Sequence, residues 1–120
     1  MLKKQYRLRK NIEFVATYAQ KKYVSGLYLI MNIGRLKPNE DFIPKAAFVV
    51  SKKIDKRAVI RNKIKRRMRA AYMSIVKDDF SCIKWMSMIF SAKSESKDAS
   101  FADIREDMEL LLKKASEKYV

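Results

Sequence analysis

Positive charge is concentrated in one stretch of this 120-residue sequence, residues 52–69. Ten of these eighteen residues are Lys or Arg and one, Asp55, is acidic, so ten positive charges minus one negative charge leave +9 of the chain's net charge of +15. Ammonium and guanidinium groups gathered in this way neutralise and hydrogen-bond the phosphates of a polyanion. The stretch therefore predicts an electrostatic binding surface for a polyanion.

The apolar residues in and after this stretch predict the element that positions the charges, an amphipathic helix that runs to about residue 76. Ile60, Ile64, Met68, Ala71 and Ile75 recur at the spacing of one helix face. Such a helix buries one side against a sheet and holds its cations out on the other. A second stripe, a quarter turn to half a turn away, consists of Arg61, Lys65 and Arg69, with Asn62 and Arg66 just beyond it.

A basic helix face is more often an ordinary solvated surface than a binding site, so further features of the sequence must favour binding. Here like charges four residues apart repel each other, and the helix has no acidic partner for them. A polyanion would relieve that repulsion. Positions four residues apart also lie about 6 Å apart along the axis, close to the spacing of phosphates along a nucleic-acid strand. These two points favour nucleic-acid binding.

Composition bounds the fold and excludes several kinds of chemistry. A chain of 120 residues with 48% hydrophobic and 34% charged residues predicts a single folded domain spanning residues 1–120. The absence of histidine excludes a histidine-based dyad, triad or zinc site. The single cysteine, Cys82, excludes an internal disulfide and suits a reducing compartment. The sequence contains neither a run of eighteen apolar residues nor an apolar segment after its basic start, so we expect no membrane span, no signal peptide and a cytoplasmic protein.

Two further helices are expected near the ends of the chain. A second basic cluster at 3–10 precedes Asn11, which we expect to cap a short helix that runs to about residue 20. Ser100 with Asp103 resembles a capping box that opens the last helix. The apolar positions expected to form the core face of that last helix are Phe101, Ile104, Met108, Leu111, Leu112 and Ala115.

Three apolar runs, at 27–33, 45–51 and 83–90, read as strands of one sheet. The segment 34–44 contains two prolines and is expected to be a hairpin connection between the first two strands. In the last run, Trp85 is expected to be a structural residue. The order is thus helix, strands, basic helix, strand, helix, which indicates an α/β sandwich with one sheet covered by helices.

The basic stretch also carries a family resemblance. Val50-Ser51-Lys52-Lys53 followed by the run from Ala58 to Arg69 (AVIRNKIKRRMR) resembles the strand and Arg-Asn-Arg signature helix of the bacterial ribonuclease P protein subunit. One residue departs from the motif, because the second arginine is Lys63 here, which replaces a planar fork with a point charge. The resemblance covers nearly the whole chain and implies one domain whose signature strand and helix span 50–76.

The resemblance implies a fold and a function. The fold is a single-domain α/β sandwich of the ribosomal protein S5 domain 2-like kind, with one mostly antiparallel sheet, a basic crossover helix and flanking N- and C-terminal helices. The function is that of the protein subunit of ribonuclease P, the endonuclease that removes the 5′ leader of precursor tRNA. The resemblance assigns catalysis to the RNA subunit, which holds Mg²⁺, and implies no metal held by the protein and no obligate protein partner.

The resemblance also assigns residues to two RNA partners. The single-stranded leader of precursor tRNA is expected on Phe14, Tyr18 and Tyr28, although the i, i+4 spacing of the first two taken alone is that of core aromatics. Asn62 can both donate and accept a hydrogen bond, so it can fix a phosphate or a sugar hydroxyl. The cations expected to neutralise phosphates of the catalytic RNA are Lys52, Lys53, Arg57, Arg61, Lys63, Lys65, Arg66 and Arg69.

Three other functions are open to a small basic protein. A structural RNA-binding protein, such as a ribosomal protein, suits the charge and size equally well but needs no site for a leader. A helix-turn-helix DNA-binding regulator would need a short helix directly before the basic one, where the sequence has the strand-like run 45–51. A protein-only nuclease would need carboxylates at metal-site spacing, which the sequence does not show.

Overall fold

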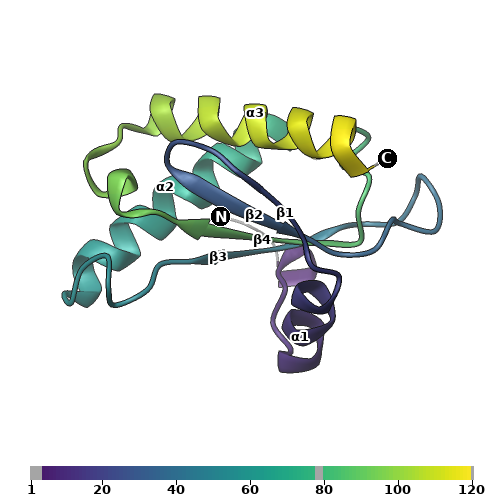
Figure 1. The fold of residues 1–120 in the computed structure, drawn as a ribbon, viewed down its shortest axis with the longest axis horizontal. Coiled ribbons are helices and arrows are strands. Elements are labelled where there is room, and N and C mark those ends of the chain that lie inside the picture. The colour runs from purple at the N-terminus through teal and green to yellow at the C-terminus, as the bar shows by residue number, and fades with distance from the viewer. Residues whose placement is uncertain (1–3, 78–79, 120) are drawn as a thin grey trace.

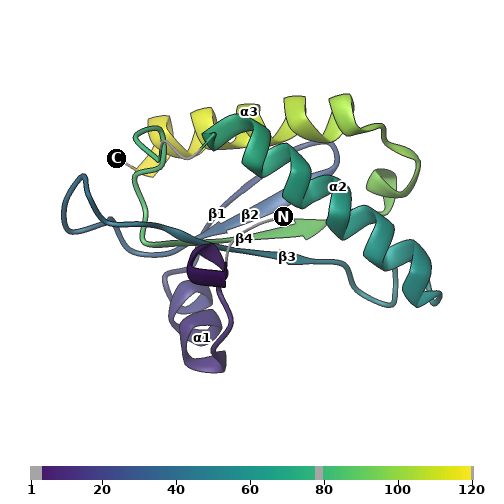
Figure 2. The ribbon, with the colours of Figure 1, turned by 180° about the vertical axis from the view of Figure 1, so that it is seen from behind.

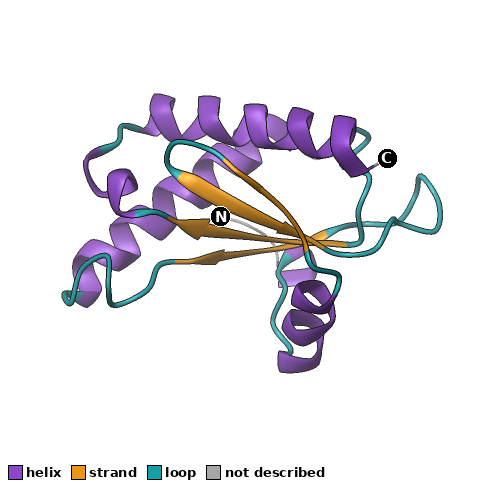
Figure 3. Cartoon of the chain, viewed as in Figure 1, coloured by secondary structure: helices purple, strands orange, loops and turns teal. Residues whose placement is uncertain are grey.

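A twisted sheet separates two long helices from one short helix in the computed structural model of the chain (Figure 1). The structure describes residues 4–77 and 80–119. Helices α2 and α3 lie on one face of the sheet, and α1 projects from the other face, as the view from behind also shows (Figure 2). The described elements, coloured by type in Figure 3, are η1 Lys4–Tyr6, α1 Asn11–Ala19, β1 Lys22–Ser25, β2 Leu29–Ile33, β3 Lys45–Val49, α2 Ala58–Val76, β4 Ser87–Ala92, η2 Ser94–Asp98 and α3 Phe101–Tyr119.

The sheet has the strand order β1-β2-β4-β3. Strand β2 pairs antiparallel with both β1 and β4, whereas β3 pairs parallel with β4, and α2 lies in the connection between these two parallel strands. The predicted mostly antiparallel sheet with a basic crossover helix is therefore confirmed. The predicted hairpin between the first two apolar runs is wrong, because β4 lies between β2 and β3: Phe90 is opposite Met31 on one side and Phe48 on the other.

Two strands differ from the apolar runs that predicted them. Strand β1 was not predicted, because it is short and only two of its residues, Tyr23 and Val24, are apolar. Strand β4 begins at Ser87 and not at residue 83. Ile83 and Trp85 are fully buried in the segment before it, so they extend the apolar run without extending the strand. Trp85 is thus a core residue, as predicted.

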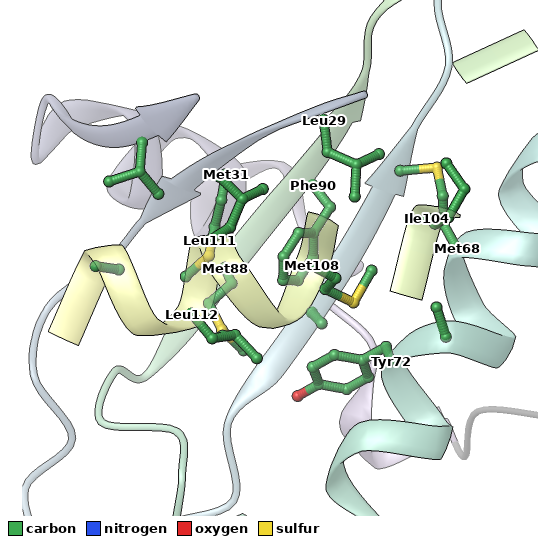
Figure 4. Close-up of a cluster of buried hydrophobic side chains, with 14 of the residues drawn as sticks. Leu29, Met31, Met68, Tyr72, Met88, Phe90, Ile104, Met108, Leu111 and Leu112 are labelled. Carbon is green, nitrogen blue, oxygen red and sulfur yellow. The ribbon is translucent and has the colours of Figure 1, made fainter. Parts of the chain in front are cut away.

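The core lies between the sheet and the two long helices (Figure 4). Phe48 and Phe90 stack at 5.7 Å between ring centres, and the Tyr72 ring packs edge-on against Phe48 at 5.8 Å. On α2 the buried face is turned slightly from the predicted one: Ile60 and Ile75 are only half-buried. The buried residues of α2 are Ile64, Met68, Ala71, Tyr72 and Val76. Helix α3 buries every predicted position except Phe101, which is 41% exposed at the first turn.

The last helix is joined to the sheet by a buried carboxylate. Asp107 of α3 is 4% exposed and accepts hydrogen bonds from three consecutive backbone N–H groups, those of Leu27 (2.9 Å), Tyr28 (3.1 Å) and Leu29 (3.0 Å). Gly26 precedes them, and any side chain there would collide with this carboxylate. Asp107 therefore fixes the turn between β1 and β2. The predicted capping box of α3 is also confirmed by reciprocal 3.1 Å hydrogen bonds between Ser100 and Asp103.

Other segments of the chain bond to the two outer strands of the sheet. The Leu8 N–H donates to the Ala46 carbonyl of β3 at 3.0 Å. On β1, the hydroxyl of Tyr119 lies 3.3 Å from the Tyr23 N–H and donates to the Tyr23 carbonyl at 3.1 Å. One residue of α3 thus engages both backbone polar groups of Tyr23.

Candidate nucleic-acid interface

Helix α2 presents the predicted cations over two flanks. Asn62, Lys63 and Arg66 are exposed, and so are Lys52 and Lys53 in the loop that precedes the helix. The stripe of Arg61, Lys65 and Arg69 is half-buried, because it borders the face that packs on the sheet. The stems of these three side chains therefore rest on protein, whereas the charges on the outer flank stand in solvent.

The loop before α2 is held in place by the carboxylate of Asp55, whose structural role was not predicted from the sequence. The side chain of Asp55 is 5% exposed and accepts from the Arg57 backbone N–H (2.8 Å), from Arg57 Nε (3.1 Å) and Nη2 (3.0 Å), and from Lys97 Nζ (2.8 Å). Lys97 belongs to η2, so the ion pair joins the loop before α2 to a segment about forty residues further along the chain. Arg57 and Lys97 hold the pKa of Asp55 well below its ordinary value.

Two arginines of the predicted interface thus have partners within the protein. Besides the Arg57 fork on Asp55, Arg61 Nη1 donates to the backbone carbonyls of Asp55 (3.0 Å) and Lys56 (2.8 Å). These bonds tie the loop to the second turn of α2. Arg61 therefore shapes the surface that presents Lys52 and Lys53, in addition to carrying charge on it.

The depressed pKa of Asp55 predicts a specific acid sensitivity. A carboxyl whose folded pKa lies below its ordinary value of 3.8 stabilises the fold above that value, and the stabilisation is lost as pH falls further. We expect Asp55→Asn to be less stable than the parent chain at pH 7 and to lose less stability between pH 4 and pH 2. Thermal unfolding midpoints across this range test the difference, and parallel acid curves for the two proteins would contradict it.

The opposite face of the sheet carries the predicted aromatic pair. Phe14 is half-buried and packs against a small cluster of Leu8, Ala47 and Ile89. Tyr18, one turn later on α1, is 44% exposed. Tyr28 does not join them: it is half-buried and packs against the core on the α2 and α3 side. The structure therefore brings Phe14 and Tyr18 together and places Tyr28 elsewhere.

Other residues share the face of the sheet that Phe14 contacts. Directly paired residues of neighbouring strands point to the same face. Asn32 pairs with both Tyr23 and Ile89, so these three side chains lie on one face, and Tyr23 is 55% exposed. Ile30 follows by the alternation along β2. Tyr23 and Asn32 were not predicted from the sequence, although the alternation along β2 was a signal that could have indicated Asn32.

The basic helix and the aromatic face meet at the β3 edge of the sheet. A hollow of about 200 Å³ there is lined by Arg69 of α2, Phe14 of α1 and Arg7 of the N-terminal segment, with Leu8 and β3 residues between them. The last cation of the predicted stripe therefore borders the same hollow as the first aromatic residue.

Helix α1 is fastened to the sheet by polar contacts. The Thr17 hydroxyl donates to the Glu13 carbonyl (2.8 Å) and lies 2.6 Å from the Ser87 hydroxyl of β4. The Glu13 carboxylate pairs with Lys45 of β3 at 3.0 Å and accepts from the Lys10 backbone N–H at 3.3 Å, so the helix is capped one residue earlier than predicted. Burial alone would raise the pKa of Glu13, but Lys45 and Lys10 outweigh it and lower that pKa.

The described ranges hold neither a cluster of potential metal ligands nor a helix that could span a membrane. Residues 4–77 and 80–119 contain no group of three or more His, Cys, Asp or Glu side chains that could hold a metal ion. Among the helices of the same ranges, none is both long and apolar enough to cross a bilayer.

Comparison with known proteins decides between the functions that the basic interface leaves open. Residues 2–116 match the family described as Ribonuclease P. The chain belongs to the ribonuclease P protein family. Members of this family are protein components of an endoribonuclease of tRNA 5′ processing in which the RNA subunit carries the catalysis, so the ribonuclease P RNA is the partner of this chain.

Individual relatives agree in sequence and in fold. The chain is 33% identical over 112 residues to a ribonuclease P protein component of Clostridium botulinum, which covers 93% of this chain and 96% of the relative. It is 30% identical over 118 residues to that of a Pseudanabaena species, covering 96% and 95%. The structure matches the Staphylococcus aureus ribonuclease P protein with a TM-score of 0.73 and 31% identity, covering 92% of this chain and 94% of that one. The predicted α/β class and family are therefore confirmed.

Proposed function

We propose that the chain binds the ribonuclease P RNA through α2 and the loop before it, and the 5′ leader of precursor tRNA through the sheet face beside Phe14 and Tyr18. The observation that carries this proposal is the hollow at the β3 edge, where Arg69 and Phe14 meet. An RNA strand that leaves the basic helix arrives there directly at an aromatic side chain. The protein would then hold enzyme RNA and substrate RNA on adjoining surfaces, at a cytoplasmic location that suits its single cysteine.

The contribution of this chain to cleavage would be electrostatic and geometric. Exposed cations on α2 and its preceding loop neutralise phosphates and so lower the repulsion between the two RNAs. Stacking on aromatic side chains tolerates any base, which suits leaders of varied sequence. Both effects favour precursor over mature tRNA and reduce the concentration of Mg²⁺ that assembly needs.

We propose that Mg²⁺ is held mainly by the RNA subunit, where it would supply the activation and charge stabilisation for phosphodiester hydrolysis. The buried carboxylates of the described chain fit this division. Asp55 is already bound by Arg57 and Lys97, and Asp107 by three backbone N–H groups. The carboxylate oxygens of Asp55 and Asp107 thus accept hydrogen bonds that stabilise the fold.

Reconstitution tests the proposal. Ribonuclease P RNA and precursor tRNA from the same source are mixed at low Mg²⁺ with and without the protein, and the position of cleavage is read on a gel. Cleavage at the mature 5′ end only in the presence of the protein is the expected result. Tight RNA binding without any stimulation of cleavage would contradict the proposal and favour a purely structural RNA-binding role.

The aromatic assignment makes a separate prediction. A stacked base contributes about 1–3 kcal/mol, so Phe14→Leu and Tyr18→Leu should each reduce the preference for leader-bearing over leaderless substrate by about fivefold or more. Binding to the ribonuclease P RNA should stay unchanged. Competition between the two substrates for the reconstituted enzyme measures the preference.

The two variants control for each other. Phe14 also packs against Leu8 and Ile89, so its replacement tests packing and stacking together. Tyr18 is 44% exposed, and its replacement leaves the small cluster intact. An unfolded Phe14→Leu protein together with a Tyr18→Leu protein of normal preference would show that the pair is a packing feature only.

A further inference from the structure

The proposed function leaves unused two hollows that adjoin α1. A cleft of about 400 Å³ lies between the N-terminal segment and the start of β3, and its charged lining is Lys4, Arg7, Arg9, Lys10, Lys45 and Glu13. A second cavity, of about 430 Å³, lies between α1, β3 and the segments around Arg35 and Met86. The cleft uses residues 4–10 of the basic cluster predicted at 3–10, and residue 3 lies outside the described residues.

The cleft has the charge of a phosphate site. Five cationic side chains line it against one carboxylate, and that carboxylate, Glu13, is paired with Lys45. The side chains of Lys4, Arg9 and Lys10 are exposed. Because these cations converge on one hollow, they match a phosphodiester better than the same charges spread over an open surface.

The cavity has a different chemistry. Leu8, Ala16, Phe42 and Met86 give it apolar walls, and Arg35, Lys45 and Glu13 add charged groups to its lining. Its volume falls within the range of pockets that bury a small organic molecule. A nucleobase is such a molecule, since it has apolar faces and a polar rim. Phe42 is half-buried, so part of its ring is available to a base.

The two hollows meet at one ion pair. Glu13 and Lys45, joined at 3.0 Å, line both the cleft and the cavity. A phosphate in the cleft and a base in the cavity would therefore lie on either side of this pair. The aromatic pair occupies another line of α1, since Phe14 and Tyr18 do not border the cavity.

We propose that these two hollows form a second RNA site, which binds an unpaired nucleotide segment with its phosphates in the cleft and one base in the cavity. The proposal rests on the proposed function, because it requires that the chain works on RNA. The same chemistry is offered by a single-stranded region of the ribonuclease P RNA and by precursor tRNA, so the experiment measures binding to each.

Filling the cavity is the most direct test. Ala16 is exposed, lines the cavity and sits within α1, so Ala16→Leu adds volume there while keeping a good helix former. Ala19→Leu makes the same change on the same helix outside the cavity. We expect Ala16→Leu to lower affinity for one of the two RNAs by about fivefold or more, the smaller end of a stacked-base contribution, and Ala19→Leu to leave both affinities unchanged.

The cleft is tested by charge removal. Arg9→Ala with Lys10→Ala should weaken binding to the same RNA and reduce the log–log salt slope by about 1.4, two contacts at about 0.7 each for a single strand. Lys113→Ala with Lys114→Ala removes equal charge from exposed positions on α3 and should leave the slope unchanged. Phe42→Leu removes the aromatic ring from the cavity lining without changing charge, so it provides a second cavity variant.

The outcomes separate this site from the proposed function. Arg61→Ala with Lys65→Ala is run in the same assay, and its loss of RNA binding shows that the main interface works as proposed. If that variant binds weakly while both Ala16→Leu and Phe42→Leu bind each RNA like the parent chain, the second site is overturned. A loss confined to the Arg9 and Lys10 variant also overturns it, because diffuse attraction without a base in the cavity would explain that result.

Discussion

Replacing Arg61 and Lys65 together with alanine is expected to weaken binding to the ribonuclease P RNA about 100-fold or more at low salt, where screening is weakest, since hydrogen bonds to charged groups contribute about 1.5–3 kcal/mol each. Both side chains lie on the half-buried stripe of α2. Their loss should also flatten the salt dependence, by about 0.7–0.9 in log–log slope for each phosphate contact removed. Filter binding at four or five salt concentrations measures both quantities.

The structure predicts that the two single variants differ. Lys65 acts as a charge, so Lys65→Ala should change slope and affinity together. Arg61 also binds the carbonyls of Asp55 and Lys56, so Arg61→Ala should lose more affinity than its slope change explains, because it releases the loop before α2. Removal of two charges from α3, as in Lys113→Ala with Lys114→Ala, is the matched control. An unchanged slope in the Arg61 and Lys65 double variant would remove the phosphate-contact assignment.

Asp107→Ala is expected to destabilise the fold by about 3 kcal/mol or more. The substitution removes three hydrogen bonds to a charged group, one buried and two part-buried, and such bonds contribute about 1.5–3 kcal/mol each before allowance for water at the part-buried ones. Of the three, the bond to Leu29 is the most buried. Urea unfolding measures the effect, which should appear as a lower midpoint with an unchanged slope.

A neighbouring carboxylate provides the control for this prediction. Glu106 is exposed on the same helix, and Glu106→Ala should change stability by less than about 0.5 kcal/mol. Asp107→Asn should fall between the two, because its amide oxygen still accepts while its amide nitrogen faces the same donors. A loss of less than about 1 kcal/mol in Asp107→Ala would mean that water replaces the carboxylate and that the turn does not depend on it.

The features predicted most accurately are those that depend on one short segment of the sequence alone. Helix α2 could be predicted to within a residue at its end, because charge and signature coincide with the apolar period over 58–69 and that period continues to about residue 76. The Ser100 and Asp103 capping box is equally local. Strand order could not be predicted, since both β2 and β3 pair with a strand that lies some forty residues or more further along the chain. The pattern of apolar residues within a segment does not indicate which strand lies between two others in the sheet.

The same distinction applies to the candidate nucleic-acid interface: features within one segment could be predicted, and contacts between distant segments could not. The cations of α2 lie at the exposed and half-buried positions of the helix, as its apolar period predicts, but the partners of Arg57 and Arg61 depend on a loop closed by Lys97 from η2. Tyr28 was grouped with the aromatic pair by resemblance, yet the turn held by Asp107 places it before the alternation of β2 begins. Phe14 and Arg69 line the same hollow only because α1 and α2 both border the β3 edge of the sheet.

The hydroxyl of Tyr119 has a consequence for the protein before it meets RNA. An outer strand with unpaired N–H and C=O groups is a template on which strands from other molecules can add, and such growth leads to aggregates. By engaging both polar groups of Tyr23, the hydroxyl interrupts that template on β1, while Leu8 does the same on β3. A chain with a net charge of +15 already repels its copies, and these contacts add a directional safeguard that salt does not screen. Newly made protein can therefore stay dispersed until it assembles with its RNA.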